Sequence, residues 1–167
     1  MARFTKDDWL ILGLSQLASA GPDALRLEAL CEAAGRTKGS FYHHFPDHDD
    51  FIAAMCEHWS DWSLEVLDAL DAGLMEGEAR LPQLAAGLDA ALEIALRRLP
   101  AASQALKTVD QTRLTWLADW WEAQGAPNPE TNAETEYAAL IGALHLYGDD
   151  PDKLRALGAT LQSALQT

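Results

Sequence analysis

The sequence predicts an all-α protein. Alanine and leucine dominate the composition, whereas the β-branched residues that favour strands are scarce. The Asn-Gly and Asp-Gly pairs typical of tight hairpins are absent. Apolar residues instead recur at i, i+3, i+4 and i+7 between glycine and proline stops, the spacing of a helix with one buried face. We therefore expect helices joined by short breaks, and no strand.

The first two helices are expected within residues 5–35. Thr5 is a good N-cap for the first, and Asp8 occupies the capping-box position three residues later. This helix extends to residue 20 and ends at "GP". The second fits "ALRLEALCEAAG", where Gly35 suits a left-handed C-terminal cap.

Two further helices follow a short turn. Thr37 can cap the third helix, "KGSFYHHF", which Pro46 ends. Asp47 can cap a long fourth helix from about residue 49 to residue 74, whose first turn is acidic, as the helix dipole favours. The remaining helices are expected at about 81–99, 101–124, 131–147 and 151–165, with breaks at Gly77, at Pro100, in "GAPNPETN" and in "GDDPDK".

The second and third helices, with the tight turn between them, predict a helix-turn-helix, which places its second helix in the major groove of DNA. At 100° per residue, Phe41 and Phe45 share the buried face of the third helix, while Gly39 and His43 lie opposite. The outward face is polar and carries no acid. A small residue at position 39 would let the helix approach base edges closely.

The net charge of −14 argues against general affinity for phosphate or anionic membranes, but the charge is uneven. Residues 1–52 hold five Lys/Arg against eight Asp/Glu, and residues 53–167 hold seven against eighteen. The acidic excess is therefore concentrated in the C-terminal two-thirds, and the outward face of the third helix contains no acidic residue.

The segment "LEALCEAAGRTKGSFYHHFPDHDDFIAAM" resembles the recognition segment of the tetracycline-repressor (TetR) family of bacterial transcription regulators. The family's pattern is an apolar residue, then Ala-x-x-Ala-Gly-x-(Ser/Thr)-x-Gly-(Ser/Thr), an aromatic residue or Leu, and Tyr-x-(His/Tyr)-Phe. The residues that match it in order are Ala33, Ala34, Gly35, Thr37, Gly39, Ser40, Phe41, Tyr42, His44 and Phe45. The resemblance covers roughly residues 5–56.

The resemblance implies two domains, a helix-turn-helix DNA-binding domain at 1–46 and a helical effector-binding and dimerisation domain at 47–167. It implies a homodimer that binds a palindromic operator in double-stranded DNA, and that forms through the helices at about 131–147 and 151–165. An unidentified small-molecule effector would bind the second domain. The residues expected at the DNA are Lys38, Gly39 and His43 near bases, and Thr37, Ser40, Tyr42, His44 and His48 near phosphates.

Some residues depart from the family's pattern. His48 stands where the family has a phosphate-binding lysine, and Glu28 and Asp47 lie near the expected path of the DNA backbone. These departures favour an alternative function, that of an acidic helical protein that binds a ligand or another protein on the same scaffold and has weak or lost DNA binding.

Core and inter-helix packing explains most of the tryptophans after residue 56 better than a binding role, but a helical cavity lined by aromatic residues would also suit an apolar effector. An aromatic pocket with an acidic side chain would favour a cationic ligand. The candidate pocket residues are Trp59, Trp62, Asp110, Trp116, Trp120 and His145, with Asp119 and Glu122 as further possible polar anchors.

Other classes of function find little support in the sequence. Pro46 separates His44 from His48, so the histidines and nearby acids lack the one-face spacing of a helical metal site, and we expect no metal and no cofactor. The sequence contains neither a nucleophile elbow nor a phosphate-binding glycine loop, so we do not expect an enzyme. Cys31 and Cys56 are expected to be small buried residues in a reducing cytoplasm. No apolar run reaches the roughly 18 residues that a membrane span needs.

Overall fold

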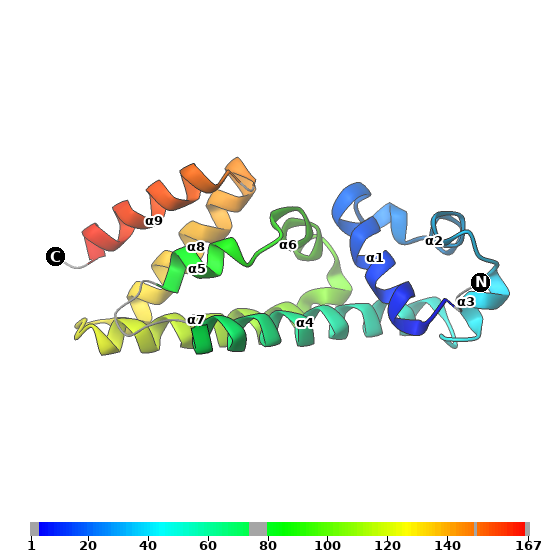
Figure 1. Cartoon of the computed structure of the whole chain (residues 1–167), viewed down its shortest axis with the longest axis horizontal. Coiled ribbons are helices and arrows are strands. Elements are labelled where there is room, and N and C mark those ends of the chain that lie inside the picture. The colour runs from blue at the N-terminus through cyan, green and yellow to red at the C-terminus, as the bar shows by residue number, and fades with distance from the viewer. Residues whose placement is uncertain (1–3, 74–79, 149, 166–167) are drawn as a thin grey trace. The chain divides into compact units, whose positions relative to one another are not determined.

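The computed structural model describes residues 4–73, 80–148 and 150–165, and the described residues form helices joined by short turns, with no strand among them (Figure 1). The helices, in chain order, are α1 (Lys6–Ala20), the 3-10 helix η1 (Pro22–Leu25), α2 (Leu27–Ala34), α3 (Lys38–Tyr42), α4 (His48–Gly73), α5 (Arg80–Ala86), α6 (Ala90–Arg97), the 3-10 helix η2 (Pro100–Ala102), α7 (Ser103–Ala123), α8 (Pro129–Tyr147) and α9 (Pro151–Leu165). The predicted all-α class is thereby confirmed.

The chain divides into two compact units. The first comprises residues 1–62 and 91–106, and the second comprises residues 63–90 and 107–167. The long helix α4 contributes to both units, so the division of contacts falls within this helix. The functional division at residue 46, into a DNA-binding part and an effector-binding part, stays a prediction.

Aromatic rings fill the core of the first unit around Phe41. The ring of Trp9 lies 5.4 Å from that of Phe41, and the ring of Phe51 lies 5.3 Å from it, both edge-on. Phe45 is 5.2 Å away. Phe41, Trp9 and Phe51 have no exposed surface, and Phe45 is 2% exposed. Because each large apolar side chain contributes about 1.5–3 kcal/mol when fully buried, this cluster fixes α1, α3 and the start of α4 against one another.

Several predicted helix ends are confirmed. The hydroxyl of Thr5 accepts a hydrogen bond from the backbone N–H of Asp8, and the Asp8 carboxylate accepts one from the backbone N–H of Thr5. Gly35 ends α2 in the left-handed region, at φ 61° and ψ 37°. Asp47 caps α4 by accepting a hydrogen bond from the N–H of Asp50 at 2.8 Å. Each of these helix ends depends on residues within about one turn, so it could be predicted from the sequence.

Other helix bounds were predicted incorrectly. The single helix expected at 81–99 is two helices, α5 and α6, because the chain turns at Gly87. The second predicted helix divides into η1 and α2 at Arg26, whose backbone is extended (φ −60°, ψ 140°). The third ends at Tyr42 instead of Phe45, and η2 precedes α7. The expected break at Gly77 and the expected helix end at Leu74 lie outside the described residues.

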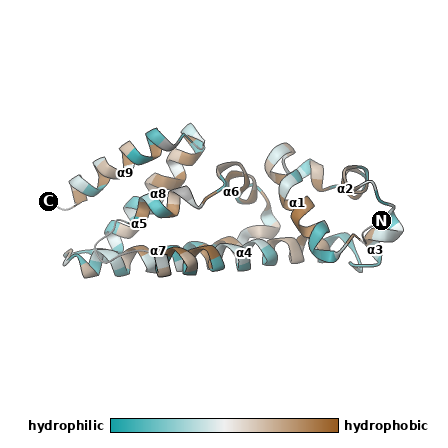
Figure 2. Cartoon of the chain, viewed as in Figure 1, coloured by the Kyte–Doolittle hydropathy of each residue, from teal (hydrophilic) through white to brown (hydrophobic). Residues whose placement is uncertain are grey.

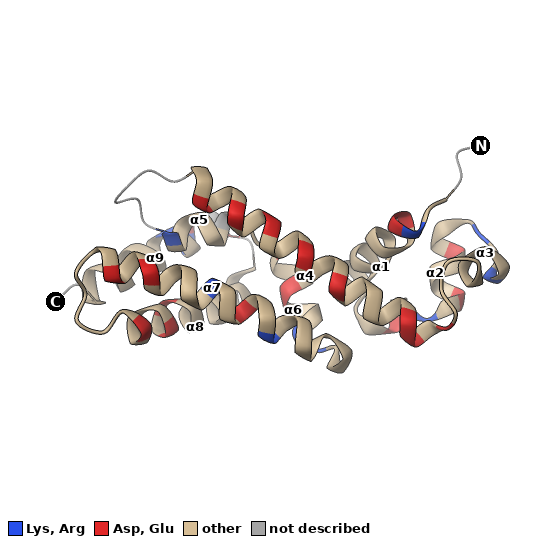
Figure 3. Cartoon of the chain, turned by 90° about the horizontal axis from the view of Figure 1, so that it is seen from below, with Lys and Arg blue, Asp and Glu red and all other residues tan. Residues whose placement is uncertain are grey.

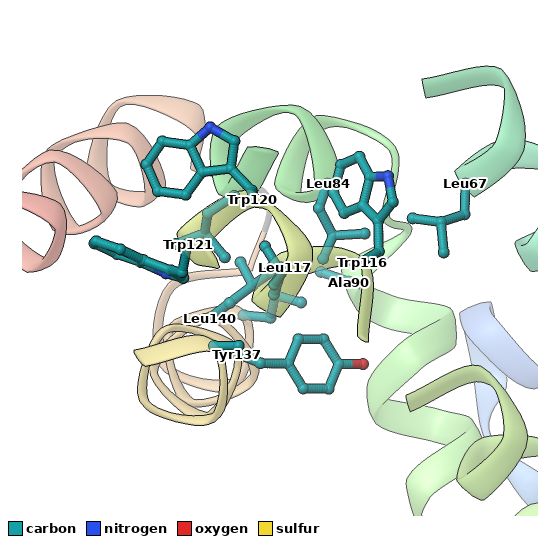
Figure 4. Packing of buried hydrophobic residues seen from close by; sticks show 12 residues of the cluster. Leu67, Leu84, Ala90, Trp116, Leu117, Trp120, Trp121, Tyr137 and Leu140 are labelled. Atoms are coloured by element: carbon teal, nitrogen blue, oxygen red, sulfur yellow. The ribbon is translucent and has the colours of Figure 1, made fainter. Parts of the chain in front are cut away.

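Tryptophan side chains and branched aliphatic residues build the core of the second unit (Figure 4). Leu117 has no exposed surface, and Trp121 is 1% exposed. The rings of Trp120 and Trp121 meet edge-on at 4.8 Å between centroids. The remaining members of this core come from α4, α5, α7 and α8 and the residue that begins α6; they are Leu67, Leu81, Leu84, Ala90, Trp116, Ala133, Tyr137, Leu140 and Leu144.

The helices mix hydrophobic and hydrophilic residues along their lengths (Figure 2). Acidic residues recur along α4 and α7, whereas basic residues are few (Figure 3). Across the described residues, each helix is too short or too polar to traverse a lipid bilayer.

Candidate functional site

Two aromatic side chains anchor α3 from its buried face. Phe41 has no exposed surface and Phe45 is 2% exposed, as the helical spacing predicted. Thr37 caps the helix, with its hydroxyl oxygen accepting a hydrogen bond from the N–H of Ser40 at 3.3 Å. A helix of only five residues has little stability of its own, so these contacts fix its orientation.

The opposite side of α3 is open to solvent. Thr37, Lys38, Gly39, Tyr42 and His43 are all exposed, and Tyr42 retains 51% of its accessible surface. A Cβ at Gly39 would meet only the Thr37 hydroxyl, at 3.7 Å, so the surface there is shallow and unobstructed. The five residues form a polar surface without acid, which we call the reading face. Ser40 lies at its edge, half-buried.

The one lysine of the reading face is paired with an acid of the preceding helix. The ammonium Nζ of Lys38 lies 2.5 Å from Oε1 of Glu28 on α2, and both side chains are largely exposed. The hydrogen bond and charge of Lys38 lower the pKa of Glu28, and those of Glu28 raise the pKa of Lys38. Glu28, which the sequence placed near the DNA backbone only as a source of repulsion, thus contacts the reading face directly.

The other basic side chains near the reading face are also engaged. Arg26 pairs with Asp23 at 2.6 Å. Arg36 is half-buried and its guanidinium lies 5.4 Å from the ring centroid of Phe4. Lys6 lies 5.7 Å from the ring of Phe45. The local positive charge is therefore modest and partly neutralised by the protein's own acids.

Two of the histidines predicted to contact phosphates form hydrogen bonds with backbone carbonyls of the same chain. Nε2 of His44 lies 3.1 Å from the backbone carbonyl of Phe4, and Nε2 of His48 lies 2.7 Å from that of Leu25. A carbonyl oxygen only accepts, so each Nε2 carries the proton and donates it. Both rings are half-buried. The second of these hydrogen bonds links His48, the first residue of α4, to Leu25, the last residue of η1. The contact of His48 with a phosphate stays a prediction.

The residues predicted to line an effector pocket are divided between the units. Trp59 and Trp62 belong to the first unit, where Trp59 is 1% exposed and Trp62 is 44% exposed. The others, Asp110, Trp116, Trp120 and His145, belong to the second unit. His145 is exposed on α8.

Trp116 is held in a three-residue cluster at one end of the second unit's core. Its indole N–H donates a hydrogen bond to Oδ1 of Asp71 at 2.8 Å. The same oxygen forms an ion pair with Nη2 of Arg80, also at 2.8 Å. The Arg80 guanidinium lies 4.8 Å from the Trp116 ring centroid and donates to the Trp116 carbonyl. These contacts connect α4, α5 and α7 and occupy the polar group of Trp116.

A polar chain also runs through the second unit. The Tyr137 hydroxyl donates to Asp110 at 2.6 Å and accepts a hydrogen bond from buried Arg113 at 3.2 Å. Burial raises the pKa of Tyr137, so the phenol stays protonated and can donate. Asp110 is thereby engaged within the protein.

Glu136 is the most deeply buried acid of the second unit. It has no exposed surface, and its Oε2 accepts a hydrogen bond from the indole N–H of Trp121 at 2.9 Å. Its Oε1 is buried without a hydrogen-bond partner among the described residues, and so is the indole N–H of Trp120. Burial raises the pKa of Glu136. The sequence analysis did not select this residue, because on an acid-rich chain nothing local distinguishes it.

A shallow groove of about 280 Å³ lies between α7 and α8. It includes Asp119 and Glu122, the two further anchors that the sequence suggested. The other lining residues are Leu114, Thr115, Ala118, Pro129, Glu130 and Glu134. The groove is acidic and lacks the predicted tryptophans.

Cys31 and Cys56 are both free and buried. Burial raises the pKa of each thiol, that of Cys56 to about 11, which disfavours the reactive thiolate. Within the described part of the chain, no three His, Cys, Asp or Glu side chains are grouped closely enough to hold a metal ion.

Part of the chain is similar in sequence to a known protein family. Residues 12–55 match the family model described as "Bacterial regulatory proteins, tetR family". The matched segment contains α2, α3 and the start of α4, and therefore the whole reading face. No curated protein sequence matches the chain.

Solved structures match nearly its whole length. A transcriptional regulator from Rhodococcus sp. Rha1 is 20% identical with a TM-score of 0.75, covering 97% of this chain and 96% of that one. A TetR-family transcriptional regulator from Agrobacterium tumefaciens is 19% identical with a TM-score of 0.74, covering 96% of each chain. The reduced form of E. coli NemR is 20% identical with a TM-score of 0.72, covering 95% of each. At these identities the likeness shows the fold.

The helices α2 and α3 form a helix-turn-helix, and the reading face lies on its second helix. Residues 12–55 of this arrangement match the family model of the TetR regulators, and the solved structures show the fold over nearly the whole chain.

Proposed function

We propose that the protein is a ligand-responsive, dimeric transcriptional repressor that binds a short palindromic operator. The observation that carries the proposal is the reading face, an acid-free exposed surface on a short helix that Phe41 and Phe45 anchor from behind. Lys38, Gly39 and His43 are the proposed base contacts, and the phosphate contacts are Thr37, Ser40, Tyr42, His44 and His48. Hydroxyl groups suit the second role because they donate to phosphate oxygens and fix register on the duplex.

The test is selection of bound sequences from a random DNA pool at low and at moderate salt. A helix-turn-helix dimer reads two half-sites about one helical turn apart, roughly 34–36 Å, so a palindrome with that spacing is expected. Recovery of no palindromic site at either salt concentration would overturn the repressor function.

The dimer is proposed to form through α8 and α9. Gly142 on α8 is exposed, and a Cβ there would meet nothing within 4 Å of the same chain. Leu146, 72% exposed, and Tyr147, 46% exposed, lie near the end of the same helix. Close helix packing between subunits requires small residues, and covering exposed leucine and tyrosine side chains favours association.

Gly142→Gln tests this interface. The folded monomer has room for the side chain, so helical content should be unchanged, whereas sedimentation should show a monomer and operator affinity should fall. Gly73→Gln, at an equally open position at the end of α4, should leave the dimer intact. Dimers of unchanged stability in both variants would place the interface elsewhere.

The effector is proposed to bind the second unit near its tryptophans, with Trp116 and Trp120 as aromatic walls and Asp110 or His145 as a polar anchor. A cationic ligand is the class that an aromatic site with an acid favours. The indole N–H of Trp120 is buried and has no hydrogen-bond partner among the described residues, so it could donate to a ligand. A panel of cationic and neutral apolar compounds should quench tryptophan fluorescence selectively, and a flat response across the panel would contradict the proposal.

A second function has specific support. Lys38 and Arg26 are paired with acids of the protein itself, and the ring nitrogens of His44 and His48 donate to backbone carbonyls. These contacts favour an acidic helical protein that binds a ligand or another protein and has weak DNA binding. The selection experiment separates the two functions, because only the repressor enriches a palindrome.

A further inference from the structure

The reading face contains one lysine, and that lysine is paired within the chain. Lys38 is the first residue of α3 and Glu28 lies in the first turn of α2, so their contact bridges the two helices of the helix-turn-helix. The Lys38 side chain is 55% exposed and that of Glu28 is 72% exposed. Both groups are therefore open to solvent, and a phosphate oxygen would have to replace the carboxylate to bind the Lys38 ammonium.

We propose that Glu28 is a specificity-determining residue, which holds Lys38 in an ion pair and so withholds it from sequence-independent contact with DNA phosphates. The inference rests on the proposed DNA-binding function of the same face, and it identifies a residue that acts through Lys38.

The physical basis is counterion release. A free lysine that neutralises a phosphate releases a cation condensed on the DNA, which contributes about 0.9 to the slope of log K against log salt concentration. A lysine already neutralised by a carboxylate of its own chain contributes no such contact while the pair persists. Sequence-independent affinity is almost entirely of this origin, whereas affinity for the operator also includes base contacts. The pair therefore lowers non-specific affinity, whereas in the operator complex the proposed base contact of Lys38 replaces its bond to Glu28.

Glu32 provides a matched control for the removal of one negative charge. It lies on α2 four residues after Glu28, is exposed, and has no ion pair among the described residues. Glu28→Gln and Glu32→Gln change the net charge equally, but only the first releases Lys38. A difference between them separates the ion pair from general repulsion.

The experiment measures the binding of a labelled random-sequence duplex by fluorescence anisotropy over a series of salt concentrations. The proteins are the wild type, E28Q, E32Q, K38A and the double variant E28Q/K38A, with helical content checked by circular dichroism. E28Q should bind about two- to fivefold more tightly at low salt, the range of an exposed ion pair, with a slope steeper by about 0.9. The wild type, K38A and the double variant should share one slope.

Three results would overturn the inference. Equal effects of E28Q and E32Q would show that only net charge matters. An undiminished E28Q effect in the K38A background would show that Glu28 acts without Lys38. A K38A slope shallower than that of the wild type would show that Lys38 already contacts phosphate.

The two proposals fail differently. The expected salt behaviour without a selected palindrome would leave the role of Glu28 intact and refute the repressor. A selected palindrome with any of the three contrary results would leave the repressor intact and refute the role of Glu28. Absence of DNA binding by every variant would refute both.

Discussion

The helix-turn-helix segment and the second unit bury different kinds of side chain. Among residues 4–52, the buried side chains are apolar, apart from the thiol of Cys31, and every charged group is exposed or half-buried. The second unit buries Arg113 at 3% exposure, Asn132 at 8% and Glu136 at 0%. An apolar core fixes one arrangement of its helices through close packing, whereas a buried charge imposes a cost that depends on its partners.

This difference separates two tasks. The first segment must present a short helix in one orientation, and the aromatic cluster around Phe41 achieves that without any group that titrates or exchanges partners. The interior of the second unit contains polar atoms whose partners a ligand or a proton could change. The comparison predicts that substitutions in the two regions will differ in size and in pH dependence.

The largest effect is expected from Phe41→Ala. Removing a fully buried ring at the centre of the aromatic cluster should lower the free energy of unfolding by about 3–5 kcal/mol. Urea denaturation followed by circular dichroism measures it. Tyr42→Phe, one residue later and 51% exposed, should cost less than about 0.5 kcal/mol. Similar costs for the two substitutions would show that α3 is not anchored as described.

Tyr137→Phe should be the next largest. The change keeps the ring but removes the hydroxyl that joins Asp110 to Arg113, leaving a buried guanidinium short of one partner. Leaving a buried group unsatisfied costs about 1–3 kcal/mol. The same denaturation experiment measures the loss, and a neutral result would mean that the polar chain contributes nothing to the second unit.

Gly13→Ala should cost about 1 kcal/mol, the difference between overpacking and improved helix propensity. An added Cβ would lie 2.7 Å from Cζ of Phe51 and 2.8 Å from Sδ of Met55. Gly39→Ala is the matched change on the exposed face, where the Cβ has room. It should not destabilise the fold but should weaken operator binding, because the methyl group separates α3 from base edges. Operator affinity equal to that of the wild type would contradict a close approach at position 39.

The smallest effect is expected from Glu136→Gln and should depend on pH. Burial raises the pKa of Glu136 above its ordinary value of 4.5, so the folded state holds its proton at pH values where the unfolded chain has lost it. The stability of the wild type should therefore fall as pH rises from about 4.5 towards the folded-state pKa. The glutamine variant lacks this term and still accepts a hydrogen bond from Trp121. It should be equal to the wild type near pH 4 and more stable than the wild type at neutral pH.

Thermal denaturation across pH tests this expectation. Glu134→Gln removes an exposed acid two residues earlier on α8 and should show no pH-dependent difference from the wild type. An E136Q curve parallel to that of the wild type at every pH would show that Glu136 does not titrate abnormally.

Features that depend on neighbouring residues could be predicted from the sequence. The capping box of Thr5 and Asp8, the left-handed Gly35 and the inward pair Phe41 and Phe45 all follow from residues within one or two turns. The turn at Gly87 was missed because "AAGLDAA" continues a helical composition and contains no proline. In the structure a Cβ at Gly87 would lie 3.4 Å from Cγ1 of Val66 and 3.5 Å from Cδ1 of Leu70 on α4, a contact between segments that the local sequence does not show.

The polar contacts of the site could not be predicted, because their partners are distant in sequence. Glu28 and Lys38 are ten residues apart, His48 and Leu25 are 23 apart, and His44 and Phe4 are 40 apart. Residue type indicates that a histidine can donate a hydrogen bond, but only the arrangement of helices selects its acceptor. The sequence therefore identified the reading face, and the structure was needed to show which of its charges are already engaged.

The hydrogen bond from His48 to the carbonyl of Leu25 bears on how position 48 could evolve. The genetic code offers no single-base change from histidine to the lysine that the family has at this position. The intermediate codons specify asparagine or glutamine, whose amides can donate to a carbonyl but carry no charge. A lineage that acquired the lysine would pass through a protein with asparagine or glutamine at position 48. The positive charge at this position would be gained only with the second mutation.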